Sequence, residues 1–260
     1  MIKLSGVTQH YGVRPVLRHV DLCIEPGELT AIVGPNGMGK STLLGVMAGV
    51  LSPQQGYVEI DGLRRRRSEV EELEIRRRVV YLPDHPWLPV NRTGREFLLG
   101  VGRLYDVDQE SLFDHIERLL RLFELGREGD WPIRTYSNGQ KKKIAICSAL
   151  VTDAPILLLD EPFTGGLDPS GILALKRVLS RVAKQQDRTV VMTAPAPELV
   201  DEIGEKIIIL REGIVVAHDT LDGLRRQASG AATLEEILAT LIHPETLQNI
   251  ERYFEGNPKP

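Results

Sequence analysis

A glycine-rich run, GPNGMGKST at residues 34–42, constrains the fold of this chain most strongly. It fits the spacing G-x-x-x-x-G-K-[ST] and follows the strand-like stretch Leu29 to Val33, which is the context that such a loop requires. Glycines let the backbone turn tightly, so that successive N–H groups and the positive end of the following helix face a polyphosphate. The run therefore predicts a nucleotide site in which Lys40 reaches the β- and γ-phosphates and Ser41 ligates Mg²⁺.

A second block, ILLLDEP at residues 156–162, supplies the acidic half of such a site. Its four apolar residues predict a buried strand that delivers Asp160 and Glu161 at its C-terminal end, where open α/β sheets bind their ligands. Asp160 is suited to hold Mg²⁺ through water, and Glu161 to orient or deprotonate an attacking water. On its own, an acidic pair that ends a strand is commonly a helix cap or a turn. Its meaning comes from the phosphate loop upstream.

Hydrophobic patterning predicts an α/β fold, a P-loop NTPase core with a mixed, largely parallel sheet and an antiparallel N-terminal β-subdomain. N-terminal strands are expected over residues 2–7, 20–24, 29–33 and 57–60. A helix is expected to follow the phosphate loop over 41–48, and a short buried strand over 79–82. Later strands are expected over 156–159, 190–193 and 206–210, alternating with helices over 171–183 and 197–203.

Helical stretches separate the phosphate loop from the acidic pair and also end the chain. Helical periodicity over roughly 93–126 places five apolar residues on one face: Leu112, Ile116, Leu119, Leu120 and Phe123. In the tail, Thr233 and Glu236 form a capping box before an apolar helix to Leu241, and a second helical stretch ends at Gly256. The first of these regions predicts a helical insertion in the nucleotide-binding core.

Length and composition agree with one compact unit. The 260 residues contain no Pro-, Ser- or Gly-rich linker, so we expect one domain over 1–220 with its helical insertion at about 93–150, and a helical extension over 221–260. The formal net charge of −4 provides no overall basic field for nucleic acid or anionic lipid. Arginine runs at 64–67 and 76–78 concentrate positive charge locally, which is typical of solvated faces.

The two cysteines, Cys23 and Cys147, have no metal-binding spacing. We expect both to be small core residues in a reduced compartment. The N-terminus, MIKLSGV, has no signal-like apolar region, and no stretch of the chain approaches about 18 apolar residues. If a membrane is involved, a separate chain is expected to span it.

A third run, YSNGQ at residues 136–140, lies between the phosphate loop and the acidic pair. With these three motifs in this order, the chain resembles the ATP-binding subunits of ATP-binding-cassette (ABC) transporters over essentially residues 2–241. In that family two cassettes sandwich two ATP molecules, and the signature run of one protomer caps the γ-phosphate that the other protomer holds. The resemblance implies that helix N-terminal groups meet this phosphate in trans; the signature residues are Ser137, Asn138, Gly139 and Gln140. Locally, Ser137 also predicts a cap for a helix through Leu150.

The resemblance also assigns the remaining site residues and the cofactors, ATP and Mg²⁺. It implies Lys40 and Glu161 as catalytic residues, with Ser41 and, through water, Asp160 as magnesium ligands. Asp168, in GGLDP, matches the acidic residue that signals across the dimer, and Tyr11 matches the aromatic residue that stacks on adenine. The ATP-binding residues that it implies are Tyr11, Gly34, Pro35, Asn36, Gly37, Met38, Gly39, Lys40, Ser41 and Thr42.

Four departures from the family pattern fall near the expected ATP sites. Asn138 replaces a glycine of the signature, and Asn accepts turn conformations. The segment DEPFTGGLDP carries one glycine more than usual, in the pair at 165–166, which is expected to alter communication across the dimer. Asp84 stands where the family has a Gln that helps to hold Mg²⁺ and the attacking water. As a catalytic residue and metal ligand, Asp84 brings a negative charge that is costly unless Mg²⁺ or an Arg offsets it.

The fourth departure is Pro195, which stands at the position of the family's γ-phosphate-sensing His. Proline has neither a side-chain donor nor a backbone N–H, and losing one donor to transition-state charge typically costs on the order of 10² to 10³ in rate. We therefore expect slow turnover. His85 and His218 are candidates to replace the missing donor, but no spacing singles either out.

Two mechanisms fit these residues. In the first, Glu161 supports modest ATP hydrolysis, and closure and opening of the cassette dimer drive a membrane partner. In the second, the chain mainly binds ATP and pairs with a more complete paralogue. Retention of the phosphate-loop lysine and of the acidic pair favours the first, whereas Asp84 and Pro195 favour the second. The sequence favours hydrolysis on balance.

The expected partners are an integral-membrane permease subunit and a second cassette, in a homodimer or with a paralogue, and no nucleic acid. The tail resembles that of subunits serving exporters with separate membrane proteins, which implies export and a peripheral position on the cytoplasmic face of the cell membrane. A coupling helix of the permease is expected to dock within 84–125, with Trp87, Leu88 and the run 64–67 at the edges. The rivals are a soluble single-cassette ATPase in cofactor assembly and a plain kinase or GTPase, which leaves YSNGQ unexplained.

Overall fold

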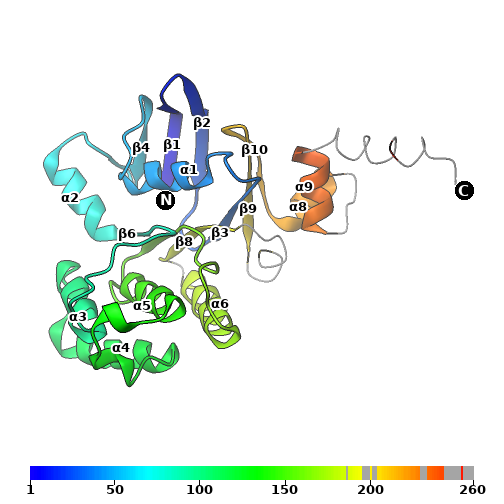
Figure 1. Ribbon diagram of the computed structural model, residues 1–260. Helices are drawn as coiled ribbons and strands as arrows, with labels where there is room; N and C mark the ends of the chain where they lie inside the picture. Colours follow the sequence, from blue (N-terminus) through cyan, green and yellow to red (C-terminus); the bar gives the residue numbers. More distant parts are fainter. Residues whose placement is uncertain (186, 195–199, 201–203, 229–232, 243–252, 254–260) are drawn as a thin grey trace, which may run out of the picture.

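The computed structural model describes residues 1–185, 187–194, 200, 204–228, 233–242 and 253. A central sheet lies between an antiparallel sheet and a group of helices, and two further short helices lie at one end of it (Figure 1). The predicted class, an α/β fold with a P-loop core, is confirmed by this arrangement.

The antiparallel sheet contains three of the four strands predicted at the N-terminus, and the fourth, over 29–33, belongs instead to the central sheet. Its strands are ordered β2-β1-β4-β5 and cover Ile2–Tyr11 (β1), Arg14–Ile24 (β2), Gln55–Ile60 (β4) and Leu63–Arg64 (β5). Buried positions alternate with more exposed ones along most of β2, because one face packs on the core and the other faces solvent. β1 and β2 extend beyond the predicted ranges, into a hairpin whose loop contains Gly12 with φ +71°.

The central sheet is ordered β10-β9-β3-β8-β7-β6. All neighbouring strands are parallel except β9 and β10. The strands cover Leu29–Val33 (β3), Val79–Leu82 (β6), Ile156–Leu159 (β7), Thr189–Thr193 (β8), Lys206–Arg211 (β9) and Ile214–Asp219 (β10). β3 and β7 therefore end at the same edge of the sheet, where the phosphate loop and the acidic pair begin.

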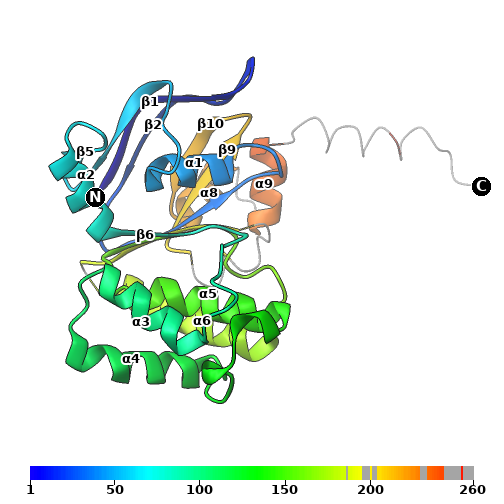
Figure 2. The ribbon, with the colours of Figure 1, turned by 60° about the vertical axis from the view of Figure 1, so that its left-hand side comes forward.

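Helices cover both faces of the central sheet. On one side, α1 (Lys40–Ala48) lies between the two sheets and α2 (Glu69–Arg78) precedes β6. On the other side is a helical lobe, which Figure 2 shows gathered below the sheet. It consists of α3 (Gly94–Leu104), α4 (Gln109–Leu122), the short 3₁₀ helices η1 (Glu128–Asp130) and η2 (Ile133–Thr135), α5 (Asn138–Leu150) and α6 (Pro169–Ala183). Two helices follow β10: α8 (Leu221–Gln227) and α9 (Leu234–Ile242).

Two apolar cores, one on each face of the central sheet, hold these layers together. In β3, Leu29, Ala31 and Val33 pack into the core beneath the helical lobe, whereas Ile32 packs into the core beneath α1 and the antiparallel sheet. Because side chains alternate between faces, a strand covered on both sides is apolar along nearly its whole length, and in β3 only Thr30 is polar. This is why the predicted strands over 29–33, 79–82 and 156–159 coincide with β3, β6 and β7.

The helical stretch predicted over 93–126 exists, but it is divided. α3 ends near Tyr105, Asp106 adopts a left-handed φ of +56°, and Asp108 caps α4. The five apolar residues predicted on one face, from Leu112 to Phe123, are all buried. Polar Asp residues at the break explain the division, because they favour turns and helix caps.

Two expectations about single residues are wrong. Cys23 is exposed rather than in the core, because it lies on the outward face of β2, while Cys147 is buried as expected. Arg65 interrupts the expected solvated arginine run: only 5% of its side chain is exposed, and its guanidinium donates to the Met47 carbonyl at 2.8 Å and to Glu72 at 3.0 Å. The predictions on 197–203, apart from helical Val200, and on the stretch ending at Gly256 lie outside the described residues.

Candidate active site

The phosphate loop joins β3 to α1 and is fixed by its backbone contacts. Gly34 has φ +150°, and a Cβ atom there would overlap the carbonyl oxygen of Leu210 in β9. Gly39, the residue before α1, has φ +99°, and a Cβ atom there would lie 2.9 Å from the carbonyl oxygen of Val16 in β2. Only glycine fits both positions, since other residues would meet steric overlap as well as an unfavourable φ. The loop is therefore pinned between the two sheets.

Lys40 occupies the centre of this loop. Its ammonium donates to the carbonyl oxygens of Gly34 at 2.8 Å and Pro35 at 3.1 Å, and lies 3.5 Å from Asn36 Oδ1. Burial lowers the pKa of Lys40, while the nearby carboxylates of Glu161 and Asp160 act in the opposite direction. The structure thus brings the predicted lysine and the predicted acidic pair into one electrostatic environment.

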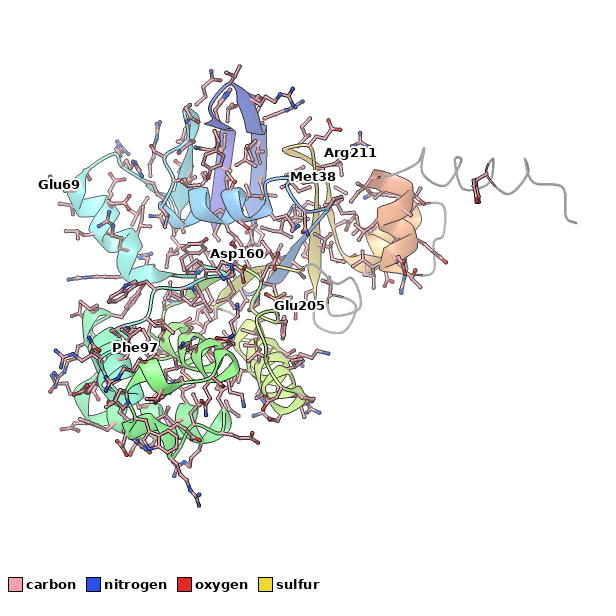
Figure 3. All side chains as sticks on the ribbon, in the orientation of Figure 1. Met38, Glu69, Phe97, Asp160, Glu205 and Arg211 are labelled. Carbon is pink, nitrogen blue, oxygen red and sulfur yellow. The ribbon has the colours of Figure 1, made fainter. Side chains whose placement is uncertain are left out.

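A chain of hydrogen bonds connects the phosphate loop to the acidic pair. Ser41 Oγ donates to Asp160 Oδ1 at 3.1 Å, and the buried hydroxyl of Thr193 donates to the same oxygen at 2.7 Å. Thr193 in turn accepts the backbone N–H of Glu161 at 2.8 Å. Asp160 lies near the middle of the molecule, at the edge of the central sheet (Figure 3). Sequence reasoning missed Thr193, although a polar residue at the C-terminal end of a buried parallel strand is a usable signal.

The oxygen atoms of Ser41 and Asp160 suit Mg²⁺, which prefers hard oxygen ligands. Among the described residues, no group of three or more His, Cys, Asp or Glu side chains could hold a metal ion. The donor set therefore fits a magnesium ion that takes one or two ligands from the protein and the others from phosphates and water.

Replacing Thr193 by valine is expected to lower the free energy of unfolding by about 1–3 kcal/mol, because it leaves the Glu161 N–H without its buried partner. Thr30→Val is the matched control. Thr30 is also a fully buried strand residue, but its hydroxyl has no hydrogen-bond partner in the described part of the chain. Urea unfolding of both variants measures the difference. Equal losses of stability in the two would contradict the assigned role of the Thr193 hydroxyl.

Asp84, in the loop after β6, lies beside the acidic pair. Its carboxylate is 3.5 Å from the ammonium of Lys142 and 3.4 Å from the hydroxyl of Thr164. The charge that was expected to need Mg²⁺ or an Arg is therefore balanced by a lysine of α5. Burial, together with Asp160 and Asp84, raises the pKa of the nearby Tyr81 to about 12, so Tyr81 stays neutral.

The signature run begins α5 as predicted. Ser137 is the N-cap: its hydroxyl accepts the Gln140 N–H at 3.2 Å, and the Gln140 side chain accepts the Ser137 N–H at 2.9 Å. The start of α5, the Asp84 loop and the glycine pair border one cleft of about 600 Å³, lined by Asp84, His85, Pro86, Leu88, Asn138, Lys141, Lys142, Gly165 and Gly166. Three of the four departures from the family pattern thus meet at one place.

Asp168 caps α6 and is tied to α5. It accepts a hydrogen bond from the Lys143 ammonium at 2.9 Å and one from the Gly171 N–H at 2.9 Å, and these two contacts, the first above all, hold its pKa below the usual range. Tyr11 lies at the end of β1 with 57% of its surface exposed, so its ring is free to stack. Both roles stay predictions.

The two histidine candidates for the missing donor differ in position. His85 is exposed and lies 3.5 Å from the carboxylate of Asp84. His218, in β10, is half-buried, which lowers its pKa. Its charged neighbours are Lys206, which begins β9 and pairs with Thr30 near the start of β3, and Glu28, which directly precedes β3. His218 is therefore at the far end of the strand from the phosphate loop. Pro195 lies outside the described residues.

A glycine loop between a parallel strand and a helix, with Ser41 bonded to Asp160, the first residue of the acidic pair, defines a P-loop nucleotide-binding protein. The family model for ABC transporters matches residues 17–164. The chain belongs to this family, as an ATP-binding subunit.

Relatives of the chain are named for drug resistance in one case and for metal import in another. It is 32% identical to the daunorubicin resistance ATP-binding protein DrrA3 of Streptomyces coeruleorubidus, over 88% of this chain and 71% of that protein. It is also 32% identical to the cobalt import ATP-binding protein CbiO of Salmonella typhi, over 84% of this chain and 80% of that protein. The similarity therefore establishes the family without the direction of transport.

Solved structures agree with the fold. An ATP-binding subunit of an ABC transporter matches with a TM-score of 0.83 at 28% identity, covering 93% of this chain and 99% of that one. A dimeric ATP-binding cassette in a post-hydrolysis state, bound to ADP and phosphate, matches with a TM-score of 0.76 at 28% identity, covering 85% and 99%. Within the described part of this chain, no helix is long and apolar enough to cross a membrane.

Proposed function

We propose that the chain binds and hydrolyses Mg²⁺-ATP within a cassette dimer and thereby drives a separate membrane permease. The observation that carries this proposal is the bonded series from Ser41 through Asp160 and Thr193 to Glu161, with the Lys40 ammonium beside it. These groups can hold a metal ion, a polyphosphate and an attacking water at one edge of the sheet.

The roles follow from the chemistry of each group. Backbone N–H groups of the loop, which every residue of 34–42 except Pro35 carries, and the Lys40 ammonium bind the phosphates. Tyr11 stacks on adenine. Ser41 and Asp160 hold Mg²⁺, which neutralises charge that develops on the phosphate oxygens. Glu161 orients the attacking water and accepts its proton.

Dimer formation brings a second signature to each ATP. Ser137, Asn138 and Gly139 lie at the N-terminus of α5, where N–H groups favour an anion. The similarity to a dimeric cassette that holds ADP and phosphate supports this pairing. The second cassette is another copy of this chain or a paralogue.

The permease docks beside the Asp84 loop and the helical lobe, within residues 84–125. Trp87, with 82% of its surface exposed, and Val90 give this edge an exposed apolar surface, and the half-buried Leu88 lines the same hollow. We propose that this contact holds the chain on the cytoplasmic face of the membrane and that the complex exports its substrate. The resemblance of the tail and the similarity to a drug-resistance protein support export.

A second candidate is an ATP-gated cassette that hydrolyses little by itself and pairs with an active paralogue. Pro195, at the position of the family's sensing His, favours it. Turnover that depends on Glu161 separates the two candidates.

The test is steady-state ATP hydrolysis by the purified chain with Mg²⁺, compared with Glu161→Gln, while ATP binding and dimer formation are followed in parallel. We expect slow turnover that falls by about 10²-fold or more in the variant, because a general base contributes about 10²–10⁴, with ATP still bound. ATP binding with no Glu161-dependent turnover, even after addition of the permease and a partner cassette, would leave the second candidate.

A further inference from the structure

Lys142 lies between the helical lobe and the catalytic edge of the sheet. It belongs to the second turn of α5, and only 4% of its side chain is exposed. Its ammonium donates to the carbonyl oxygen of Glu161 at 3.0 Å and lies 3.4 Å from the carbonyl oxygen of Asp84. It is also 3.5 Å from the Asp84 carboxylate. One buried cation thus joins three segments that are far apart in the sequence.

The first segment contains Glu161 in an unusual conformation. Glu161 has φ +46°, a left-handed value that costs roughly 1–2 kcal/mol for a residue other than glycine. Hydrogen bonds hold this conformation from both sides: the N–H donates to Thr193, and the carbonyl accepts from Lys142 and, at 2.9 Å, from Thr164 Oγ1. The backbone conformation at Cα sets the direction of the Cα–Cβ bond. These hydrogen bonds therefore also fix the direction in which the Glu161 side chain extends.

The second segment is the Asp84 loop. Asp84, Glu161 and Asp160 all contribute to the electrostatic environment of Lys142, in that order. The three carboxylates lie close together near the C-terminal ends of the central strands, and their mutual repulsion is costly unless a nearby cation offsets it. Lys142 supplies such a cation from the protein, at a distance that keeps the Asp84 loop against the acidic pair.

The third segment is α5 itself, whose first turn carries the signature residues. Lys142 follows Gln140 by two positions, so a displacement of the helix N-terminus moves the ammonium as well. A lysine at this place connects the surface that meets the second cassette with the backbone of the proposed catalytic base.

We propose that Lys142 is a positioning residue for ATP hydrolysis: it holds the Glu161 backbone and the Asp84 loop in place from the signature helix. This inference rests on the proposed function only for its effect on turnover, because the ion pair and the hydrogen bond belong to the chain without nucleotide.

The test uses the full chain and the variants Lys142→Met, Lys142→Arg, Asp84→Asn and the double variant Lys142→Met/Asp84→Asn. Lys184→Met, at an exposed residue after α6, is the control for loss of a lysine charge. Three quantities are measured: the turnover number, the dissociation constant for a non-hydrolysable fluorescent ATP analogue with Mg²⁺, and thermal unfolding without nucleotide.

We expect Lys142→Met to lower the turnover number by about 10- to 100-fold, as small displacements of catalytic groups do. The dissociation constant of the analogue should change by less than about threefold, because the phosphate-loop contacts stay intact. Arginine at this position should recover most of the turnover, and Lys184→Met should behave as the unmodified chain. A purely structural role would instead reduce ATP binding and turnover together.

Thermal unfolding tests the ion pair between Lys142 and Asp84 independently of ATP hydrolysis. Lys142→Met should lower the melting temperature by about 3–6 °C, since it leaves Asp84 without its counter-charge. The double variant should lose less than the sum of the two single variants. Additive losses, or turnover of Lys142→Met within twofold of the unmodified chain, would overturn the proposal. If the unmodified chain shows no turnover that depends on Glu161, the proposed hydrolysis is wrong. The unfolding measurements still test the ion pair between Lys142 and Asp84 in that case.

Discussion

Replacing Lys40 by methionine is expected to weaken ATP binding by about 10²- to 10⁴-fold. Charge-assisted hydrogen bonds contribute about 1.5–3 kcal/mol each, and about 1.4 kcal/mol corresponds to a factor of ten, so losing two such bonds to phosphate gives this range. The lysine is in position to make them, because its ammonium already lies within the loop, against the Gly34 and Pro35 carbonyls. Equilibrium titration with a fluorescent ATP analogue measures the effect.

The fold should survive this substitution. Burial disfavours the charged form of Lys40 and lowers its pKa, so methionine removes a desolvation cost that offsets the loss of the hydrogen bonds to the Gly34 and Pro35 carbonyls. We therefore expect a melting temperature within about 3 °C of the unmodified chain, while Lys184→Met at an exposed position leaves binding unchanged. ATP affinity retained within about threefold in Lys40→Met would show that the loop is not the phosphate site.

The parts of the fold that could be predicted are those with short-range signals. β3, β6 and β7 are almost wholly apolar on both faces, and Gly34, Pro83 and Asp160 directly follow them, so their C-terminal limits are visible in the sequence. Helix α2 was missed because Ile75 is its one fully buried residue, and a stripe of apolar side chains is lacking. It is specified instead by the Ser68 cap and by i,i+4 pairs such as Arg76 with Glu72.

In the candidate site, too, the parts that could be predicted are those with short-range sequence signals. The phosphate loop and the acidic pair are contiguous motifs, whereas the groups that join them come from distant residues. Thr193 bonds to Asp160 across 33 positions, and Lys142 reaches Asp84 across 58. No spacing rule connects such residues, because sheet order and helix packing decide which of them meet. The sequence indicates that the negative charge of Asp84 needs a cation nearby, but it does not show that Lys142 supplies it.

The additional glycine near the acidic pair has a structural consequence at the signature. Gly165 and Gly166 have φ values of +84° and +93°, and the turn that they form places the Gly166 carbonyl against α5. A Cβ atom on Gly139 would lie 2.6 Å from that carbonyl oxygen. The backbones of Gly139 and Gly166 therefore lie in close contact, and there is no room for a side chain at Gly139.

Gly139→Ala is accordingly expected to lower the free energy of unfolding by about 1–3 kcal/mol, the usual cost of forcing an extra methyl group into a packed site. Turnover should fall by about 100-fold, since the start of α5 must shift relative to the ATP that we propose it meets, and displacements near 1 Å cost that much. Gly100→Ala is the matched control: Gly100 is also helical, but nothing lies within 4 Å of a Cβ atom there. That variant should gain about 0.5–1 kcal/mol from the higher helix propensity of alanine and keep its turnover.

Urea unfolding and ATP hydrolysis, measured on both variants, separate the two sites. Equal stability changes would contradict the contact between Gly139 and Gly166, and full turnover in Gly139→Ala would contradict the role assigned to the signature.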